Sequence, residues 1–180
     1  MKDYSKTIET DRLILRKFNK NDVDSMYKNY CSHEKVAEYV TWNAHKNIDE
    51  TKEYLEKIVL PNYEKDYTYR WAIVLKEINQ VVGCIDVVNY NIDKKSAEIG
   101  YVLSDDFWGK GIMPEAGKVI IEYLFSEGFV RIWAVHSVEN KKSGRVMQKI
   151  GMTHEGTLQK FAFSNKGELV DCEIYAIISR

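Results

Sequence analysis

The sequence predicts a single α/β domain built on a mixed sheet. Strand-like and helix-like segments follow one another along all 180 residues, in the order strand, helices, three strands, helix, strand, helix and two strands. Short polar connections between strands favour antiparallel pairing, whereas a strand, a crossover helix and a strand favour one parallel pair. Because no repeat, low-complexity run or linker interrupts this order, residues 1–180 are expected to form one domain.

The beginning of the chain is predicted to hold one strand and two short helices. The stretch 10–18 has the dense aliphatic centre of a strand. Cap-forming residues at 19–24 predict a helix that runs to about Tyr30. A second short helix is expected at 34–39.

A capping box predicts where a third helix starts. Asn47 has the position of the cap, and Glu50 that of the third helical residue. Pro61 lacks an amide hydrogen, so we expect it to end this helix or to kink it. Four apolar residues are expected on one face of the helix: Ile48, Leu55, Ile58 and Val59.

The rest of the chain is predicted to hold six strands and two helices. The strands are expected at 70–76, 80–88, 96–103, 130–138, 153–163 and 169–179. One helix follows a glycine-containing turn, stops at Gly128 and carries an apolar face of Met113, Ala116, Ile120 and Leu124. The other is capped by Asn140 and ends at Gly151.

The composition is that of a globular protein, with 44% hydrophobic and 29% charged residues. The formal net charge of −1 gives no overall basic field, so neither a nucleic acid nor a membrane is expected as a partner. The beginning of the chain lacks an apolar signal region, and no apolar run is long enough to cross a bilayer. These features predict a cytoplasmic protein.

Cysteine and histidine positions predict neither a disulfide framework nor a metal site. The three cysteines lie far apart without CxxC spacing, and the four histidines show no metal-ligand spacing. We therefore expect free thiols and no bound metal. The residues concerned are Cys31, Cys84 and Cys172, and His33, His45, His136 and His154.

The segment 103–116 is the strongest candidate for a ligand site. Gly109 and Gly111 bracket Lys110 between a strand and a helix, and Pro114 suits the first helical turn. A helix start reached through such a turn offers unpaired N–H donors to an anion such as phosphate. From these residues alone, a loop that uses glycine only for its geometry explains the segment equally well.

Two common phosphate-binding motifs do not fit this turn. A P-loop has four residues between its first glycine and Gly-Lys, and Ser or Thr follows the lysine. Here five residues separate Gly111 from Gly117, and Val119 follows Lys118. A dinucleotide fingerprint has a third glycine, where this chain has Pro114.

The Trp108-Gly109-Lys110-Gly111 turn between a strand and a helix resembles the GNAT superfamily of acyl-CoA N-acyltransferases. The signature turn of that superfamily is Gln/Arg-x-x-Gly-x-Gly/Ala. Gly111 matches the first glycine, while Trp108 stands at the Gln/Arg position and Met113 at the last one. Both departures are similar to the ribosomal-protein N-terminal acetyltransferase branch, where Trp-Gly-Lys-Gly before a Glu-Ala helix start is usual.

Four other stretches are similar to that branch: 9–16, 97–101, 140–152 and 155–157. The resemblance covers nearly the whole chain and implies a GNAT fold. That fold has a mixed, mostly antiparallel central sheet flanked by helices, with its fourth and fifth strands splayed apart. In this sequence those strands are the predicted ones at 96–103 and 130–138.

The resemblance implies that the chain binds acetyl-CoA in the gap between these strands. Backbone groups of Tyr101, Val102 and Leu103 would pair with the pantetheine arm. Trp108 would either flank the cofactor or close the core over the turn. The implied pyrophosphate contacts are the amides of Gly109, Lys110, Gly111, Ile112 and Met113.

The last helix is the other implied contact with the cofactor. Asn140 would touch the pantetheine, although helix capping alone explains an Asn there. Many GNAT enzymes protonate the thiolate with a Tyr that here falls on Met147, so that acid is missing. A basic bias on this helix fits CoA phosphates or a solvated helix face: Lys141, Lys142, Arg145 and Lys149.

Ser143 and Glu98 are the candidate catalytic residues. Ser143 stands one turn before Met147, where the ribosomal branch uses a Ser to stabilise the thiolate; alternatively, it is a small residue that lets the cofactor approach. Glu98 is either the general base or a strand residue with a structural partner. His136 ends a predicted strand and lies either at the site or on the surface.

The predicted function is acetyl-CoA-dependent N-acetylation of a primary amine by direct transfer in a ternary complex. The acceptor is a protein N-terminus or a small-molecule amine. Alternatives are a longer acyl-CoA donor or a CoA-binding sensor without turnover, and a homodimer is an alternative to a monomer. Aromatic and polar residues are expected either to line the acceptor site or to lie in the core: Tyr39, Trp42, Asn43, Phe161 and Phe163.

Overall fold

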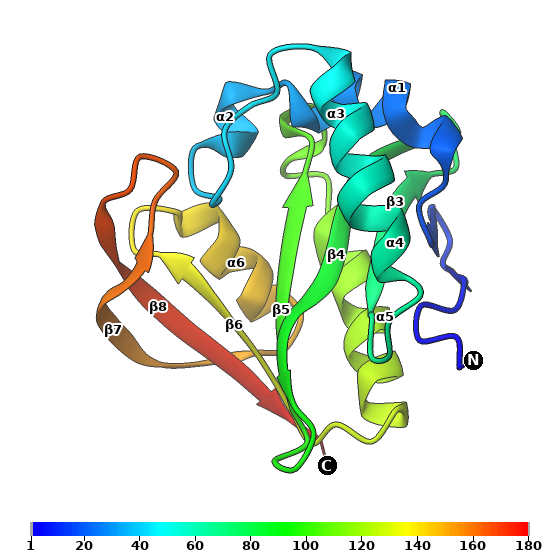
Figure 1. Cartoon of the computed structure of the whole chain (residues 1–180). Coiled ribbons are helices and arrows are strands. Elements are labelled where there is room, and N and C mark those ends of the chain that lie inside the picture. Colours follow the sequence, from blue (N-terminus) through cyan, green and yellow to red (C-terminus); the bar gives the residue numbers. More distant parts are fainter. Residues whose placement is uncertain (1, 180) are drawn as a thin grey trace.

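A computed structural model describes residues 2–179, and its centre is an eight-stranded sheet (Figure 1). The strand order is β1-β2-β3-β4-β5-β6-β8-β7. Neighbouring strands are antiparallel except β5 and β6, which are parallel as the crossover helix predicts. The strands are β1 (Ile8–Glu9), β2 (Leu13–Arg16), β3 (Arg70–Leu75), β4 (Gln80–Asn91), β5 (Ser96–Leu103), β6 (Arg131–Ser137), β7 (Thr153–Phe163) and β8 (Leu169–Ile178).

Helices cover both faces of the sheet, and β3 shows how its sequence separates the two cores. Trp71, Ile73 and Leu75 belong to the core shared with α5 (Ile112–Ser126) and α6 (Lys141–Lys149). The alternate residues Ala72 and Val74 belong to the core under the helices of residues 20–62. Since successive side chains of a strand point to opposite faces, one apolar strand serves both layers.

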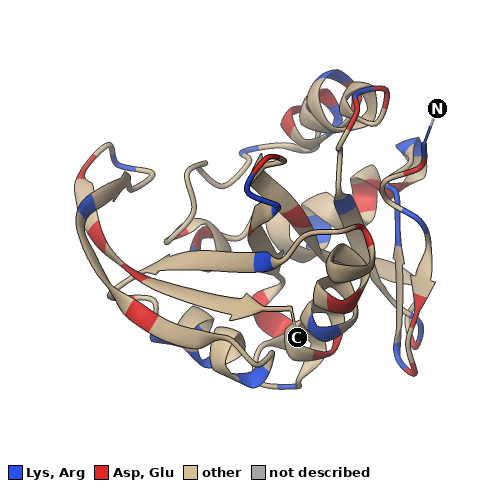
Figure 2. Cartoon of the chain, turned by 90° about the horizontal axis from the view of Figure 1, so that it is seen from below, with Lys and Arg blue, Asp and Glu red and all other residues tan. Residues whose placement is uncertain are grey.

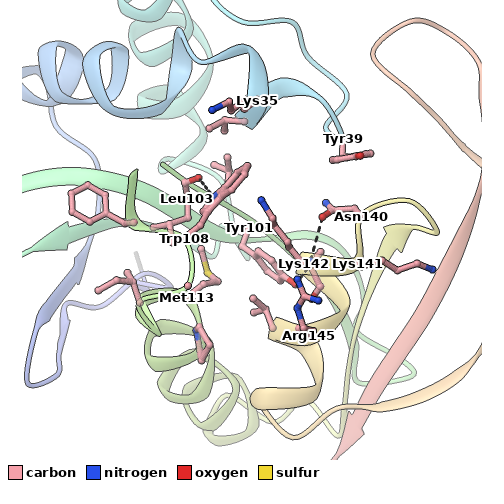
Figure 3. Close-up of a pocket in the computed structure, with 18 of the residues that line it drawn as sticks. Lys35, Tyr39, Tyr101, Leu103, Trp108, Met113, Asn140, Lys141, Lys142 and Arg145 are labelled. Atoms are coloured by element: carbon pink, nitrogen blue, oxygen red, sulfur yellow. Dashed lines mark hydrogen bonds between the residues drawn. The ribbon is translucent and has the colours of Figure 1, made fainter. Parts of the chain in front are cut away.

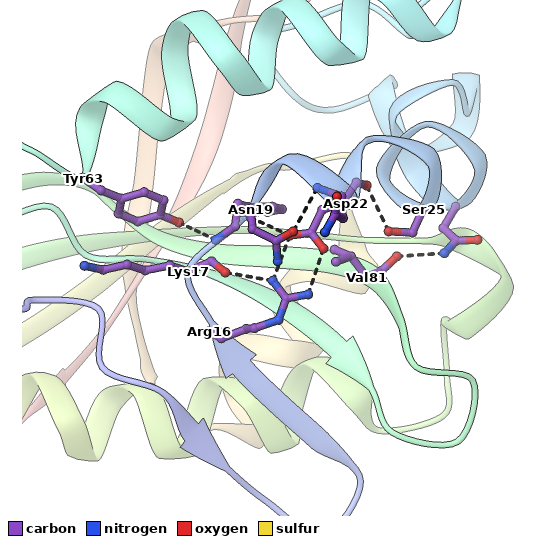
Figure 4. Close-up of polar contacts among 10 residues, drawn as sticks. Arg16, Lys17, Asn19, Asp22, Ser25, Tyr63 and Val81 are labelled. Atoms are coloured by element: carbon purple, nitrogen blue, oxygen red, sulfur yellow. Dashed lines mark hydrogen bonds and ion pairs between the residues drawn. The ribbon is translucent and has the colours of Figure 1, made fainter.

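The first helical segment starts in the predicted cap-forming stretch, and the structure shows a capping box there (Figure 4). The side chain of Asn19 accepts from the amide of Asn21 (2.9 Å), and the side chain of Asp22 accepts from the amide of Asn19 (2.8 Å). The guanidinium of Arg16 binds both carboxylate oxygens of Asp22 at 2.8 Å, which ties the end of β2 to this helix start. The segment consists of η1 (Lys20–Asp22), α1 (Val23–Met26) and a π turn, η2 (Tyr27–Cys31), and α2 (Glu34–Ala37) follows.

The second helical segment starts at Asn47, whose side chain accepts from the amide of Glu50 (3.1 Å). The Glu50 side chain accepts from the amide of Lys46 instead of that of Asn47, so the capping box is only half formed. Beyond α3 (Ile48–Tyr54) the chain makes a π turn, η3 (Leu55–Val59), and it ends with Pro61 inside α4 (Leu60–Asn62).

The predicted apolar face of this segment is partly wrong. Leu55 and Val59 are fully buried, but Ile48 and Ile58 are 38% and 50% exposed. The wider π turn brings residues four apart into line and turns the residue three positions on toward solvent. Thr51 takes the vacant buried position, four residues before Leu55.

Most other boundaries agree with the sequence. β5 has the predicted bounds, β4 runs three residues further than expected, and the short β1 was missed. α5 carries its predicted apolar face into the core. Its C-terminus is followed by Gly128 at φ +99°, a conformation that favours glycine.

Candidate active site

A cleft of about 670 Å³ lies between the end of β5, the turn before α5, the start of α6, and α2 (Figure 3). Most residues that the sequence singles out for cofactor binding meet here although they come from separate elements. Those that line the cleft are Tyr101, Val102, Leu103, Trp108, Gly109, Gly111, Ile112, Met113, Asn140, Ser143 and Lys149.

The cleft follows the fork between β5 and β6. These two strands pair only from Ser96 with Arg131 to Glu98 with Trp133. β5 continues to Leu103 and remains paired with β4 on its other side. The edge of β5 beyond Glu98 therefore lies open toward α6, and an extended ligand could pair with it.

The glycine turn closes one end of the cleft. Gly109 and Gly111 have φ values of +78° and +76°, which an L side chain rarely adopts. Gly111 is also the N-cap of α5, and it provides no side-chain bond to the first amides of that helix. These amides and the helix dipole form an anion site of the kind that a pyrophosphate fits.

An ion pair from the connection between β1 and β2 braces this turn, and no sequence motif predicted it. The Nε of Arg12 binds Oε2 of Glu115 (2.7 Å), and its Nη1 binds the carbonyl of Lys110 (2.9 Å). The hydroxyl of Thr10 donates to Oε1 of Glu115 (2.5 Å). Burial opposes ionisation of Glu115, but the Thr10 and Arg12 contacts outweigh it and hold the pKa below its ordinary value.

Trp108 both packs in the protein and lines the cleft. Its indole N–H donates to the carbonyl of Leu103 (2.8 Å), and its ring contacts both hydrophobic cores. The ammonium of Lys142 lies 4.1 Å from the ring centroid, so a cation–π contact joins the turn to α6 across the cleft.

The cleft has a positive lining in a chain whose charges are otherwise mixed. Figure 2 shows both signs of charge spread over the sheet and the helical layers. The charged residues of the lining are five basic ones, Lys35, Lys141, Lys142, Arg145 and Lys149, and two acidic ones, Glu38 and Glu139. This bias suits a ligand with several phosphates.

A pair of hydroxyl groups lines the cleft. The hydroxyl of Tyr101 is 2.8 Å from Oγ of Ser143 and also donates to the carbonyl of Ser143 (3.0 Å). Burial raises the pKa of Tyr101, although the bond with Ser143 opposes this, so the phenol stays protonated at neutral pH. Asn140 holds the start of α6 in place, because its side chain accepts from the amide of Ser143 (3.3 Å).

Comparisons with known proteins agree on one family. The sequence profile of the acetyltransferase (GNAT) domain matches residues 12–153. The uncharacterized N-acetyltransferase YnaD of Bacillus subtilis (strain 168) is 33% identical over 172 residues, which cover 95% of this chain and 96% of YnaD. The chain belongs to the GNAT acetyltransferase family.

Two further relatives extend the comparison. The ribosomal-protein-serine acetyltransferase of Escherichia coli (strain K12) is 25% identical over 174 residues, 94% of each chain. The structure of the microcin C7 self-immunity acetyltransferase MccE, solved with acetyl-CoA and AMP, superposes with a TM-score of 0.83 at 25% identity and covers 94% of each chain. This GNAT protein is therefore an N-acetyltransferase by family.

Three of the predicted site residues lie outside the cleft lining of this GNAT domain. The ammonium of Lys110 lies over the ring of Phe107 (5.0 Å), and Met147 is buried in the core. Glu98 is half-buried at the point where β5 and β6 separate. Burial raises the pKa of Glu98, partly offset by a hydrogen bond from Asn89.

His136 is neither at the cleft nor on the surface, which corrects both expectations. It is 7% exposed and lies under α6, where a Cβ on Gly144 would come within 2.6 Å of its Nε2. Its Nδ1 lies 2.7 Å from the carbonyl of Ser137, and burial lowers its pKa. Gly144 therefore allows α6 to approach β6 closely.

The expected acceptor residues are spread over three places. Tyr39 lines the cleft, together with Lys35 and Val36 of α2. Trp42 lines a separate, smaller cavity, and Asn43 is exposed. Phe161 and Phe163 lie on β7 with exposed fractions of 48% and 62%, so they are not core residues.

Long-range contacts hold α2 over the cleft, and no sequence motif predicted them. Nδ1 of His33 lies 2.5 Å from a carboxylate oxygen of Asp105, which follows β5. Asn165, in the turn between β7 and β8, donates to the carbonyl of Ala37 (2.9 Å). α2 is thus fixed from both sides of the fork.

Two classes of feature were not found among residues 2–179. No group of three His, Cys, Asp or Glu side chains is arranged to hold a metal ion. No helix of this part of the chain is long and apolar enough to cross a membrane.

Proposed function

We propose that this GNAT domain, formed by residues 1–180 as a single unit, transfers the acetyl group of acetyl-CoA directly to a primary amine in a ternary complex. The observation that supports this is the continuous cleft from the glycine turn to the Tyr101–Ser143 hydroxyl pair. One end suits phosphates and the other holds hydrogen-bond donors, as a thioester substrate of CoA requires.

The residues of the cleft fit CoA by their chemistry. The uncapped amides after Gly111 would bind the pyrophosphate, and Lys142, Arg145 and Lys149 would neutralise further phosphate charge. The open edge of β5 at 101–103 would pair with the amide groups of the pantetheine arm. When bound, acetyl-CoA supplies the activated acyl group.

Ser143 would stabilise the departing thiolate, with Tyr101 as a positioning residue. The phenol of Tyr101 has one proton, which it donates either to the carbonyl or to Oγ of Ser143. When it donates to Oγ, the proton of Ser143 is free to point into the cleft. Tyr101 would then take over part of the role of the Tyr that is replaced by Met147.

Glu98 would accept, through water, a proton from the ammonium group of the acceptor, so that the neutral amine can attack the thioester carbonyl. Burial raises the pKa of Glu98, so its carboxylate is a stronger base than that of an exposed Glu. Activity should therefore fall on the acid side as Glu98 becomes protonated, at a higher pH than for an exposed Glu. In Glu98→Gln this acid limb of the pH–rate profile should disappear; an unchanged profile would reject the assignment.

The acceptor would be a protein N-terminus or a small amine in the cytoplasm, without a nucleic acid, a membrane or a metal. The E. coli relative named for ribosomal-protein serine supports the first option. The departure at Met147 keeps a CoA-binding sensor without turnover as a second candidate. Sedimentation at several concentrations would distinguish a monomer from a homodimer.

Calorimetry with acetyl-CoA and CoA, followed by thiol-release assays on an amine panel, tests the proposal. Binding with turnover on at least one amine supports transfer, whereas binding without turnover on any amine supports the sensor. Absence of binding at micromolar concentrations would contradict both. Lys118→Ala is the matched control, because Lys118 is exposed on α5 outside the cleft lining.

A further inference from the structure

A second cavity of about 100 Å³ lies under the helical segments of residues 20–62, on the face of the sheet opposite α5 and α6. Phe18, Tyr30, Trp42 and Tyr54 contribute four aromatic rings to its wall. The cavity is smaller than the engineered apolar cavity of about 150 Å³ that binds benzene. It has room for a compact group of a ligand but not for a whole cofactor.

The cavity adjoins the reactive part of the main cleft. Val102 lines both spaces, and it packs toward the core under the helices of residues 20–62. Its neighbour Tyr101 packs with the opposite core and holds Ser143. A molecule that reaches the fork from the side of these helices would therefore place a substituent in the cavity and its reactive atom near the hydroxyl pair.

The aromatic wall is neutral. The ring of His45 packs at a tilt against Trp42 and edge-to-face against Tyr54, at centroid distances of 5.9 and 6.0 Å. Its Nδ1 lies 2.8 Å from the hydroxyl of Thr51, and burial lowers its pKa, opposed by the charge of Glu50. An uncharged imidazole between two rings favours an apolar guest.

The charge at the cavity disfavours a cationic guest. Arg70 lines the cavity, and its Nη1 lies 3.4 Å from the hydroxyl of Tyr54. Its Nε and Nη2 are bound by Asp86, a carboxylate that is itself outside the lining. Within the described chain, 2–179, no Asp or Glu lines the cavity, so an ammonium group there would have no free counterion.

We propose that this cavity binds a compact aliphatic substituent of the acceptor, so that the substrate is a primary amine with a short branched or linear alkyl group near the nitrogen. This inference rests on the proposed function. The same chemistry occurs in small alkylamines and in peptides whose first residue is aliphatic. Polyamines are excluded as good acceptors, because their second ammonium group would enter a space without a carboxylate.

Calorimetric titration of the protein, with and without saturating CoA, tests the cavity independently of turnover. The probes are methylamine, propylamine, isobutylamine, putrescine, and tripeptides that begin with Gly or Leu. Affinity should rise about fourfold with each buried carbon from methylamine to isobutylamine, and putrescine should bind no better than methylamine. If the Leu peptide binds more tightly than the Gly peptide while the free alkylamines all bind equally, the alkyl group belongs to a protein N-terminus.

Two variants and one control test whether the preference for longer alkylamines arises in this cavity. Cys84→Leu places a larger side chain in the lining, so isobutylamine should bind this variant no more tightly than methylamine does. Trp42→Ala enlarges the cavity, so phenethylamine should also bind this variant more tightly than methylamine does. Val88→Leu changes an exposed residue of the same strand and should leave the series as in the wild type. CoA affinity and melting temperature verify that each variant is folded.

An equal affinity for methylamine and isobutylamine in the wild type, with and without CoA, would overturn the inference whatever the enzyme does in thiol-release assays. Thiol release without any alkyl preference would preserve the proposed function and reject only this cavity. Alkyl discrimination without thiol release would preserve the cavity and reject the transferase.

Discussion

The glycine-turn end of the cleft and the helical layer of residues 20–62 differ in how far apart in the sequence the residues lie that determine their structure. The turn and α6 are built from residues 101–149, and two glycines and an Asn cap define their geometry. The helical layer contains two π turns, and it encloses a cavity lined by residues from Phe18 to Val102. The glycine-turn end can thus be predicted largely from local rules, whereas the helical layer depends on packing between distant segments.

The largest expected effect comes from removing a hydroxyl group of the Tyr101–Ser143 pair, which should slow the reaction without weakening CoA binding. Ser143→Ala and Tyr101→Phe should each lower kcat, the Ser variant by about a hundredfold, as when one donor to a developing negative charge is removed. Steady-state kinetics and calorimetry should show that CoA affinity changes little. Ser126→Ala, which removes a hydroxyl bonded within α5, is the control. Full activity of both variants would show that the pair is structural.

The next largest effect concerns the helical layer, where we expect a substitution to lower the stability of the protein without changing CoA binding. Asp22→Ala removes the partner of Arg16 and the acceptor for the amide of Asn19, at a cost of about 2 kcal/mol in the free energy of unfolding. Denaturant unfolding measures the loss, and CoA affinity should stay within twofold of the wild type. A large loss of CoA affinity would show that the two regions are coupled.

A smaller effect is expected at the glycine turn. Gly111→Val forces a β-branched residue to φ +76°, with its Cβ 3.5 Å from Nη2 of Arg12, and should weaken CoA binding about tenfold, equal to about 1.4 kcal/mol. Gly128→Val carries a similar backbone strain at φ +99°, far from the turn, and should spare CoA binding. Equal CoA affinities of the two variants would contradict the phosphate role of the turn.

The smallest effect should come from a single cation of the cleft. Lys142→Ala removes one charge and the contact with Trp108, so we expect about threefold weaker CoA binding, or about 0.7 kcal/mol. Salt should weaken wild-type binding more than binding by the variant, because screening acts on the lost charge. Parallel salt titrations test this, with Lys118→Ala as the control.

The sequence predicted the fold well where short-range signals act. The bounds of β5, the caps at Asn19 and Asn140 and the stop at Gly128 depend on residues within a few positions of one another. The prediction failed at Ile58, because it assumed a regular helical period that the π turn breaks, and at Ile48, which is the first residue of α3 and is exposed. It also placed His136 at the site or surface, whereas α6 covers that residue.

By itself, the sequence determined the order of the elements apart from the short β1, the glycine turn before α5 and the family to which the chain belongs. These properties follow from backbone preferences and local spacing, which need no knowledge of distant residues. Only the tertiary structure decided that Tyr101 meets Ser143, that Arg12 braces Glu115 and that α2 covers the cleft. Such contacts join residues far apart in the chain, and their geometry is set by the pairing of strands and the packing of helices on them.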